Sequence, residues 1–271
     1  MNNDQNNEKF TTSDKKIQEL TEISQKYSKI ISNVMLETQK NIIGQEGIIK
    51  KILISIISDG HVLLESVPGL AKTLMIKTMA DIFSVNNVRI QFTPDLLPAD
   101  ILGTKIYKNN SETFEIQKGP IFHNFVLADE INRAPPKVQS ALLESMQEKQ
   151  VSIHGETFQL EKPFLVLATQ NPIENEGTYK LPEAQVDRFA LKILITYPTK
   201  DQEIEIIKRN TVNSEIKINP ILKSKEILEM QKFNSEIYAD NVILKYVASI
   251  IDATRNPSKY DLDLKNIIEF G

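Results

Sequence analysis

The chain has 271 residues, of which 41% are hydrophobic and 25% charged, and its formal net charge is −4. This composition is typical of a globular protein with a substantial core, and no apolar run approaches the roughly 20 residues of a membrane-spanning helix. The absence of cysteine excludes disulfides, thiolate chemistry and Cys-ligated zinc. The acidic balance disfavours a nucleic-acid partner, and the polar N-terminus lacks an apolar signal segment, so we expect a cytoplasmic protein without membrane insertion.

The N-terminal segment predicts a polar tail and two helices. Residues 1–11 are expected to be disordered. Apolar residues recur at three- and four-residue spacing from Ser13 to Val34, which predicts a helix capped by Thr12 or Ser13. A second helix is predicted from Glu46 to Ser58, because an Asp-Gly turn follows it.

Five short apolar runs follow, and they alternate with helical patterns. Such runs are typical of strands buried on both faces, so the alternation predicts a parallel sheet. The runs are His61–Ser66, Val88–Thr93, Phe125–Glu130, Phe164–Pro172 and Ala190–Tyr197. Ligands bind at the carboxyl ends of the strands in sheets of this kind. The polar residues at these ends are Ser66, Asp129, Glu130, Thr169, Gln170 and Asn171.

Other segments complete the pattern along the chain. Two β-hairpins are predicted, one in Thr104–Ile116 and one in Val151–Leu160, and they either contact a partner or are surface loops without a role. His61 begins an apolar run, so we expect it to be packed in the core and not to bind metal. After Pro198 the strands stop, and amphipathic patterns predict a helical domain from Thr199 onward.

The stretch from Ser66 to Thr73 is similar to a phosphate-binding loop. In the pattern G-x-x-x-x-G-K-S/T, backbone N–H groups cradle the phosphates, the lysine reaches the outer phosphates and the hydroxyl binds Mg²⁺. Lys72 and Thr73 are present, whereas Ser66 and Ala71 stand where glycine is usual. Alanine is compatible with the loop if Ala71 has helical dihedral angles. The alternative is a strand–turn–helix unit that contains Lys-Thr by chance.

The third apolar run ends in two adjacent carboxylates, Asp129 and Glu130. Asp129 can hold Mg²⁺ through water, and Glu130 can orient or activate an attacking water. Phosphoryl transfer depends mainly on positioning and charge neutralisation, which these groups can supply. Together with the loop, this run predicts a site that binds and hydrolyses a nucleotide.

Taken together, the motifs from Asn41 to Gly271 resemble the MoxR family of AAA+ ATPases. The resemblance is carried by NIIGQE (41–46), GHVLLESVPGLAKT (60–73), FTPDLLPADILGT (92–104), FVLADEINRAPPKVQSALLESMQE (125–148) and LATQNPIENEGTYKLPEAQVDRF (167–189). It implies an α/β fold: a P-loop AAA+ core with a five-stranded parallel sheet in the order 5-1-4-3-2, flanked by helices and followed by a smaller helical lid. The implied domains are a nucleotide-binding domain at 12–198 and the lid at 199–271.

The resemblance also implies roles for individual residues. Glu130 would be catalytic, Asn171 would be the sensor of the γ-phosphate or lytic water, and Arg188 would be an arginine finger acting on a neighbouring subunit. The alternatives are that Asn171 caps a turn and Arg188 forms an interface salt bridge. The implied Mg²⁺ residues are Thr73 and Asp129. The implied nucleotide-binding residues are Ile42, Ile43, Gly44, Ser66, Val67, Pro68, Gly69, Leu70, Ala71, Lys72, Thr73 and Leu74.

Two departures from the family pattern are expected to matter. The family usually has glycine where Ser66 stands, although alanine before the lysine is its usual form. The sequence ends at Gly271, where a stretch with a second sensor arginine would begin, so we expect a shortened lid.

The predicted function is an ATPase that converts ATP and water to ADP and phosphate with Mg²⁺. By resemblance it assembles as a ring, as a hexamer, and remodels partner proteins as a chaperone does. The resemblance implies client proteins or proteins with von Willebrand A domains as partners, without identifying one. The alternative is a nucleotide-gated scaffold with weak or absent hydrolysis. A GTPase is disfavoured because Thr199-Lys200-Asp201 is not an Asn-Lys-x-Asp motif, and a DNA-translocating motor is disfavoured by the acidic balance.

Overall fold

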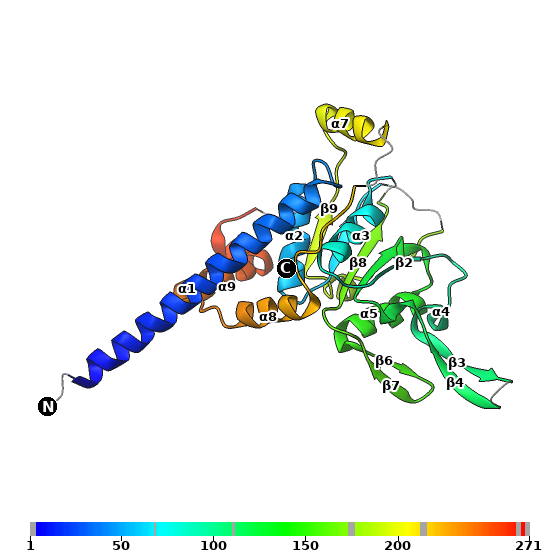
Figure 1. Cartoon of the computed structure of the whole chain (residues 1–271), viewed down its shortest axis with the longest axis horizontal. Helices are drawn as coiled ribbons and strands as arrows, with labels where there is room; N and C mark the ends of the chain where they lie inside the picture. Colours follow the sequence, from blue (N-terminus) through cyan, green and yellow to red (C-terminus); the bar gives the residue numbers. More distant parts are fainter. Residues whose placement is uncertain are drawn as a thin grey trace. The chain divides into compact units, whose positions relative to one another are not determined.

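The computed structural model describes residues 4–67, 69–109, 112–172, 177–211, 216–263 and 267–268. The chain divides into two compact units, Met1–Gln231 and Lys232–Gly271. The first unit holds the central sheet and every motif described above, and Figure 1 shows its elements coloured along the chain. No helix within the described ranges is both long enough and apolar enough to cross a membrane.

Two helices precede the sheet, α1 (Asp4–Gln39) and α2 (Glu46–Ile57). The predicted start of the first helix at Thr12 or Ser13 is wrong, because α1 runs through both positions. The preceding segment contains glutamine, glutamate and lysine, which favour a helix, so α1 extends into the predicted polar tail. The C-terminal part of α1 packs on the core through Val34, which is fully buried.

The five apolar runs form one parallel sheet, as predicted. The strands are β1 (Val62–Glu65), β2 (Asn87–Gln91), β5 (Phe125–Asp129), β8 (Leu165–Gln170) and β9 (Leu191–Leu194). Their order is β2-β5-β8-β1-β9, and every neighbouring pair is parallel. When only these strands are numbered along the chain, the order reads 5-1-4-3-2 from the β9 edge. The predicted fold class is therefore confirmed.

The sheet separates two hydrophobic layers. Side chains alternate between the faces of a strand, so Leu64 of β1 contributes to one layer and Leu63 to the other. The first layer includes α2, α3 (Lys72–Ile82) and the end of α1, whereas the second includes α4 (Pro98–Leu102) and α5 (Pro136–Glu148). Burial on both faces explains why the strand sequences are almost continuously apolar.

Both predicted hairpins are confirmed. Figure 1 shows them projecting from the same side of the first unit, and an ion pair of 3.9 Å joins Lys105 of one hairpin to Glu156 of the other. Asn110 and Ser111, in the predicted turn of the first hairpin, lie outside the described residues. The hairpins are formed by β3 (Gly103–Lys108) with β4 (Thr113–Lys118) and by β6 (Gln150–Ile153) with β7 (Glu156–Gln159).

The remaining helices are either short helices between the strands or helices that come after β9 in the chain. The boundary between the two compact units falls inside α8, while the predicted division into a nucleotide-binding domain at 12–198 and a lid at 199–271 stays a prediction. The second unit contains α9. These elements are the 3₁₀ helices Pro120–Phe122, Ile131–Arg133 and Pro257–Tyr260, and the α-helices α6 (Glu183–Val186), α7 (Lys200–Thr211), α8 (Ser224–Ser235) and α9 (Asn241–Arg255).

The amino end of the sheet contains the packed histidine that the sequence predicts. His61 directly precedes β1, and its Nδ1 accepts a hydrogen bond from the N–H of Val166 at 3.0 Å. This fixes the proton on Nε2, which donates to the carbonyl oxygen of Met146 at 3.2 Å. Burial lowers the pKa of His61 to about 4, so the ring is neutral at physiological pH.

Candidate nucleotide-binding site

The loop between β1 and α3 folds Lys72 back onto the start of the loop. Lys72 is the first residue of α3, and its Nζ donates to Ser66 Oγ at 3.0 Å and to the carbonyl oxygen of Val67 at 3.5 Å. Ser66 is buried, and its own N–H donates to the carbonyl oxygen of Gln170 in β8 at 3.1 Å. The hydroxyl that replaces the usual glycine therefore holds the lysine amine at the carboxyl end of the sheet.

The backbone of Ala71 does not meet the condition under which the sequence makes alanine compatible with the loop. Its φ of 51° and ψ of 25° are left-handed and not right-handed helical. The chain passes through two left-handed residues, Gly69 at φ 85° and Ala71, before α3 begins at Lys72. A left-handed alanine costs roughly 1–2 kcal/mol, which glycine would avoid. Pro68 lies outside the described residues, so its role stays a prediction.

Asp129, at the end of β5, is a buried carboxylate with partners on both oxygens. Its Oδ1 accepts from Thr169 Oγ1 at 2.7 Å, and its Oδ2 accepts from Arg89 Nε at 3.0 Å and Arg89 Nη2 at 2.6 Å. Arg89 comes from β2, which pairs with β5 in the sheet. The charge of Asp129 is thus balanced by an arginine of the neighbouring strand.

Glu130 is tied into the same network. Its left-handed backbone, with φ of 59°, directs its N–H to Thr169 Oγ1 at 2.8 Å. Its Oε2 accepts from Gln91 Nε2 at 2.9 Å and forms an ion pair with Arg133 Nε at 3.0 Å. Gln91 Oε1 in turn accepts from Arg89 Nη2 at 2.6 Å. Both adjacent carboxylates are therefore held by donors within the chain.

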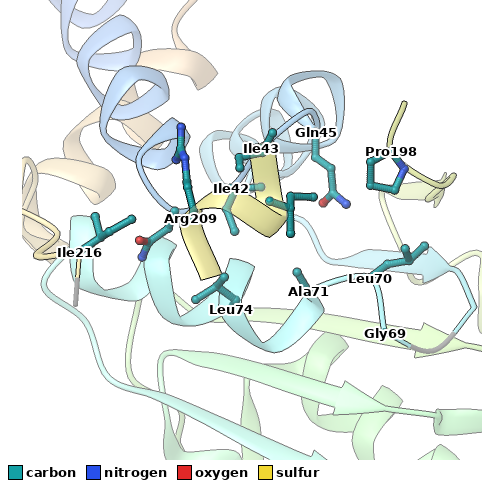
Figure 2. A pocket seen from close by; sticks show the side chains of 12 residues that line it. Ile42, Ile43, Gln45, Gly69, Leu70, Ala71, Leu74, Pro198, Arg209 and Ile216 are labelled. Atoms are coloured by element: carbon teal, nitrogen blue, oxygen red, sulfur yellow. The ribbon is translucent and has the colours of Figure 1, made fainter. Parts of the chain in front are cut away.

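A cavity of about 380 Å³ lies beside the loop (Figure 2). Six of the predicted nucleotide-binding residues line it: Ile42, Ile43, Gly69, Leu70, Ala71 and Leu74. Gly44 does not line the cavity; its φ is 72°, and an added Cβ would meet the Gln202 side chain. Lys72 and Thr73 begin α3 directly after the lining residue Ala71.

Several cavity residues were not predicted from the sequence. Arg209 of α7 donates from Nη1 to the carbonyl oxygens of Gln39 at 3.1 Å and Lys40 at 2.5 Å, which ties α7 to the end of α1. No local pattern indicates a contact between positions this far apart in the chain. Asn41 and Gln45, by contrast, lie within the stretch NIIGQE, beside residues predicted to border adenine. The lining residues that were missed are Asn41, Gln45, Pro198, Ile206, Arg209 and Ile216.

Asn171 and Arg188 lie outside this cavity. Asn171 follows β8, is almost fully buried, and lines a second cavity of about 480 Å³ together with Glu65 and Gln170. Arg188 is exposed and lines a third cavity beside α5. The structure thus places Asn171 at the carboxyl end of the sheet, directly after the strand that pairs with β5, and leaves Arg188 on the surface.

The predicted Mg²⁺ residues fit that ion in kind. Mg²⁺ prefers oxygen ligands and is usually held by one or two carboxylates together with substrate phosphates. Asp129 supplies a carboxylate and Thr73, exposed at the start of α3, supplies a hydroxyl. Within the described ranges, no group of three or more acidic or histidine side chains could hold a metal.

Comparisons with known proteins agree with this architecture. Residues 61–191 match the family model described as "ATPase family associated with various cellular activities (AAA)". The chain is 47% identical over 242 residues to chaperone MoxR1 of Mycobacterium tuberculosis, an alignment that covers 89% of this chain and 64% of that protein. It is 29% identical over 238 residues to protein MoxR of Paracoccus denitrificans, which covers 83% of this chain and 69% of that protein.

A solved structure extends the comparison to the fold. The crystal structure of a candidate ATPase from Cytophaga hutchinsonii matches with a TM-score of 0.84 and 48% identity, and covers 92% of this chain and 76% of that one. The chain spans about two thirds of the length of the two curated relatives named above. The sheet order, the loop and these matches lead to one assignment: the chain belongs to the MoxR family of AAA+ ATPases.

Proposed function

We propose that this chain binds ATP with Mg²⁺ beside the loop that carries Lys72 and hydrolyses it to ADP and phosphate. The observation that carries the proposal is the position of three groups at one edge of the sheet. The Lys72 amine, Asp129 and Glu130 all lie at the carboxyl ends of parallel strands, and a cavity lined mostly by apolar residues adjoins the loop. Family membership supports the same activity.

In this proposal, binding and turnover use different residues. Lys72 exchanges the Ser66 hydroxyl for the outer phosphates. Backbone N–H groups at the start of α3 bind the phosphates, as the first N–H groups of a helix do for anions in general. Thr73 and Asp129 hold Mg²⁺, which when bound neutralises charge on the transferred phosphoryl group. Glu130 orients or activates the attacking water, once its carboxylate leaves Gln91 and Arg133. Asn171 contacts the γ-phosphate or this water.

The proposal also includes assembly into a ring and binding to partner proteins. Arg188 is exposed and has no ion-pair partner among the described residues, which suits a finger that reaches the nucleotide of a neighbouring subunit. A hexameric ring, a cytoplasmic location, and client or von Willebrand A domain proteins rest on membership of the family alone. If Arg188 acts between subunits, specific activity falls on dilution as the ring dissociates; specific activity that stays constant to high dilution contradicts shared sites.

The second candidate is a nucleotide-gated scaffold with weak hydrolysis. It is favoured by the network that engages both carboxylates, since Glu130 is already held by Gln91 and Arg133. Measuring phosphate release beside ATP affinity, on the full chain, separates the two functions. We expect turnover, and we expect Glu130→Gln to keep ATP affinity while turnover falls about 10²–10⁴-fold, the range for a lost general base. Tight binding without turnover in the unmodified chain would identify the scaffold instead.

A further inference from the structure

Arg89 is bound to the carboxylate that the proposed function assigns to Mg²⁺. Its Nε and Nη2 donate to Asp129 Oδ2 at 3.0 Å and 2.6 Å, so both lone pairs of that oxygen are in use. Thr169 Oγ1 donates to Oδ1 of the same carboxylate at 2.7 Å. A cation that approaches Asp129 therefore meets a carboxylate whose charge is already balanced by a guanidinium.

The register of the sheet explains why Arg89 reaches this carboxylate. β2 is an edge strand, and Gln91 lies opposite Asp129 in its parallel pairing with β5. Arg89 comes two residues before Gln91, so the two side chains share one face of the sheet. Leu127, two residues before Asp129, packs in the hydrophobic layer that contains α3. Arg89 and Asp129 thus meet on the side of the sheet that α3 covers, where Thr73 lies in the first turn of that helix.

The contact between Arg89 and Asp129 can open without disturbing the core. Asp129 is 6% exposed, whereas the Arg89 side chain is 49% exposed and can rotate into water. The other partner of its Nη2 is also a side chain, Gln91 Oε1 at 2.6 Å. Separating a half-exposed ion pair costs little, because water screens it. A divalent ion that arrives together with phosphate oxygens can therefore displace the guanidinium.

We propose that Arg89 is a built-in counter-ion that competes with Mg²⁺ for Asp129. Without nucleotide, the guanidinium balances the carboxylate and disfavours the binding of free Mg²⁺. Arg89 leaves Asp129 Oδ2 when the ion arrives with the triphosphate. This inference rests on the proposed nucleotide site and adds the residue that makes loading of the ion depend on the nucleotide. Removing the guanidinium should therefore strengthen the effect of Mg²⁺ on nucleotide binding.

The experiment measures the dissociation constant of AMP-PNP, a non-hydrolysable ATP analogue, by calorimetry in excess EDTA and in excess Mg²⁺. The ratio of the two constants reports how much Mg²⁺ strengthens binding, and the calorimetric stoichiometry shows that each variant is folded. We expect this ratio to be about five-fold larger in Arg89→Met, the effect of one half-exposed ion pair that no longer opposes the ion. The gain should come from tighter binding in Mg²⁺. Weaker binding of Arg89→Met in both solutions would instead make Arg89 a phosphate ligand and overturn the proposal.

The matched control is Lys192→Met, which also removes a cation from an edge strand of the sheet. The Lys192 side chain is likewise 49% exposed, and its Nζ pairs with Glu65 Oε2 at 3.0 Å. Because Glu65 is not assigned to Mg²⁺, this variant should leave the ratio unchanged. In an Asp129→Asn background, Arg89→Met should no longer raise the ratio, since the competition takes place at that carboxylate.

The outcomes separate this inference from the proposed function. An unchanged ratio in Arg89→Met, an equal rise in Lys192→Met, or a rise that persists with Asp129→Asn would overturn the role of Arg89 while leaving the nucleotide site intact. If AMP-PNP does not bind to the unmodified chain in either solution, the proposed function fails and this inference fails with it.

Discussion

The polar side chains at the two ends of the central sheet differ in the kind of hydrogen-bond partner that they have. At the amino end, His61 and Asn124 are buried and bonded to backbone groups: Asn124 donates to the carbonyl oxygen of Pro163 at 3.0 Å. At the carboxyl end, Lys72, Asp129 and Glu130 are charged and are held mainly by side chains. Backbone partners cannot leave without disturbing the sheet, whereas side chains can rotate away. The amino end is therefore built for stability and the carboxyl end for exchange of partners.

The largest expected effect at the amino end concerns pH. The pKa of His61 is lowered from 6.5 to about 4 in the fold, so the unfolded chain binds the proton more readily. Its contribution to stability is complete above about pH 6.5 and is lost as the pH falls toward 4, by about 3 kcal/mol in total. Chemical denaturation at a series of pH values measures this loss.

The control for that prediction is His61→Asn. Its Oδ1 can accept from the N–H of Val166 but does not titrate in this range. The variant should unfold with a flatter dependence on pH between 6.5 and 4. If its stability depends on pH in the same way as that of the unmodified chain, groups other than His61 cause the loss. The claim that buried His61 stabilises the amino end of the sheet would then be wrong.

At the carboxyl end, Arg89→Met should lower stability by about 1–2 kcal/mol. The change leaves Asp129 buried without its cation, a loss reduced here because the Arg89 side chain is 49% exposed and screened by water. Urea denaturation without Mg²⁺ or nucleotide measures the loss. The double variant Arg89→Met with Asp129→Asn removes both charges and should recover part of it. A double variant no more stable than Arg89→Met would show that the charge pair is not the cause.

A smaller effect, on ATP affinity, is expected in the loop between β1 and α3, where Ser66 holds the amine of Lys72. Ser66→Gly removes the hydroxyl that accepts from Lys72 Nζ, so the amine is released for phosphate. We expect ATP to bind about five-fold more tightly, corresponding to about 1 kcal/mol for one hydrogen bond. Equilibrium binding measures the change, and Ser84→Gly, on the same unit but away from the loop, serves as the control. Unchanged or weaker binding in Ser66→Gly would mean that the hydroxyl does not compete with phosphate.

Much of this arrangement follows from the sequence. Continuous apolar runs predicted the strands, and the adjacent carboxylates after the third run predicted the acidic end of β5. The left-handed backbone of Ala71 could not be predicted, because the closure of the loop between β1 and α3 sets it and the residue type does not. The pairing of Arg89 with Asp129 depends on the neighbouring positions of β2 and β5, which a linear pattern does not contain.

The residues that line the cavity could likewise be predicted from the sequence only in part. The residues of NIIGQE are contiguous, so the sequence could place Ile42 and Ile43 at the nucleotide. Arg209 reaches the cavity from α7 because it bonds to carbonyl oxygens at the end of α1, and nothing near position 209 indicates this contact. Gln45 Oε1 is buried and has no hydrogen-bond partner within the part of the chain that the structure describes. Its burial depends on groups from several elements, so the sequence alone does not indicate it.

The central claim is that the Lys72 amine binds the phosphates of ATP. The affinity of the Lys72→Ala variant for ATP tests this claim most directly. Each charge-assisted hydrogen bond lost in Lys72→Ala is worth roughly 1.5–3 kcal/mol, so ATP should bind at least about ten-fold more weakly and, with two bonds lost, beyond detection. Lys77→Ala, an exposed lysine of the same helix, is the matched control and should bind ATP normally. Wild-type affinity for ATP in Lys72→Ala would contradict the account.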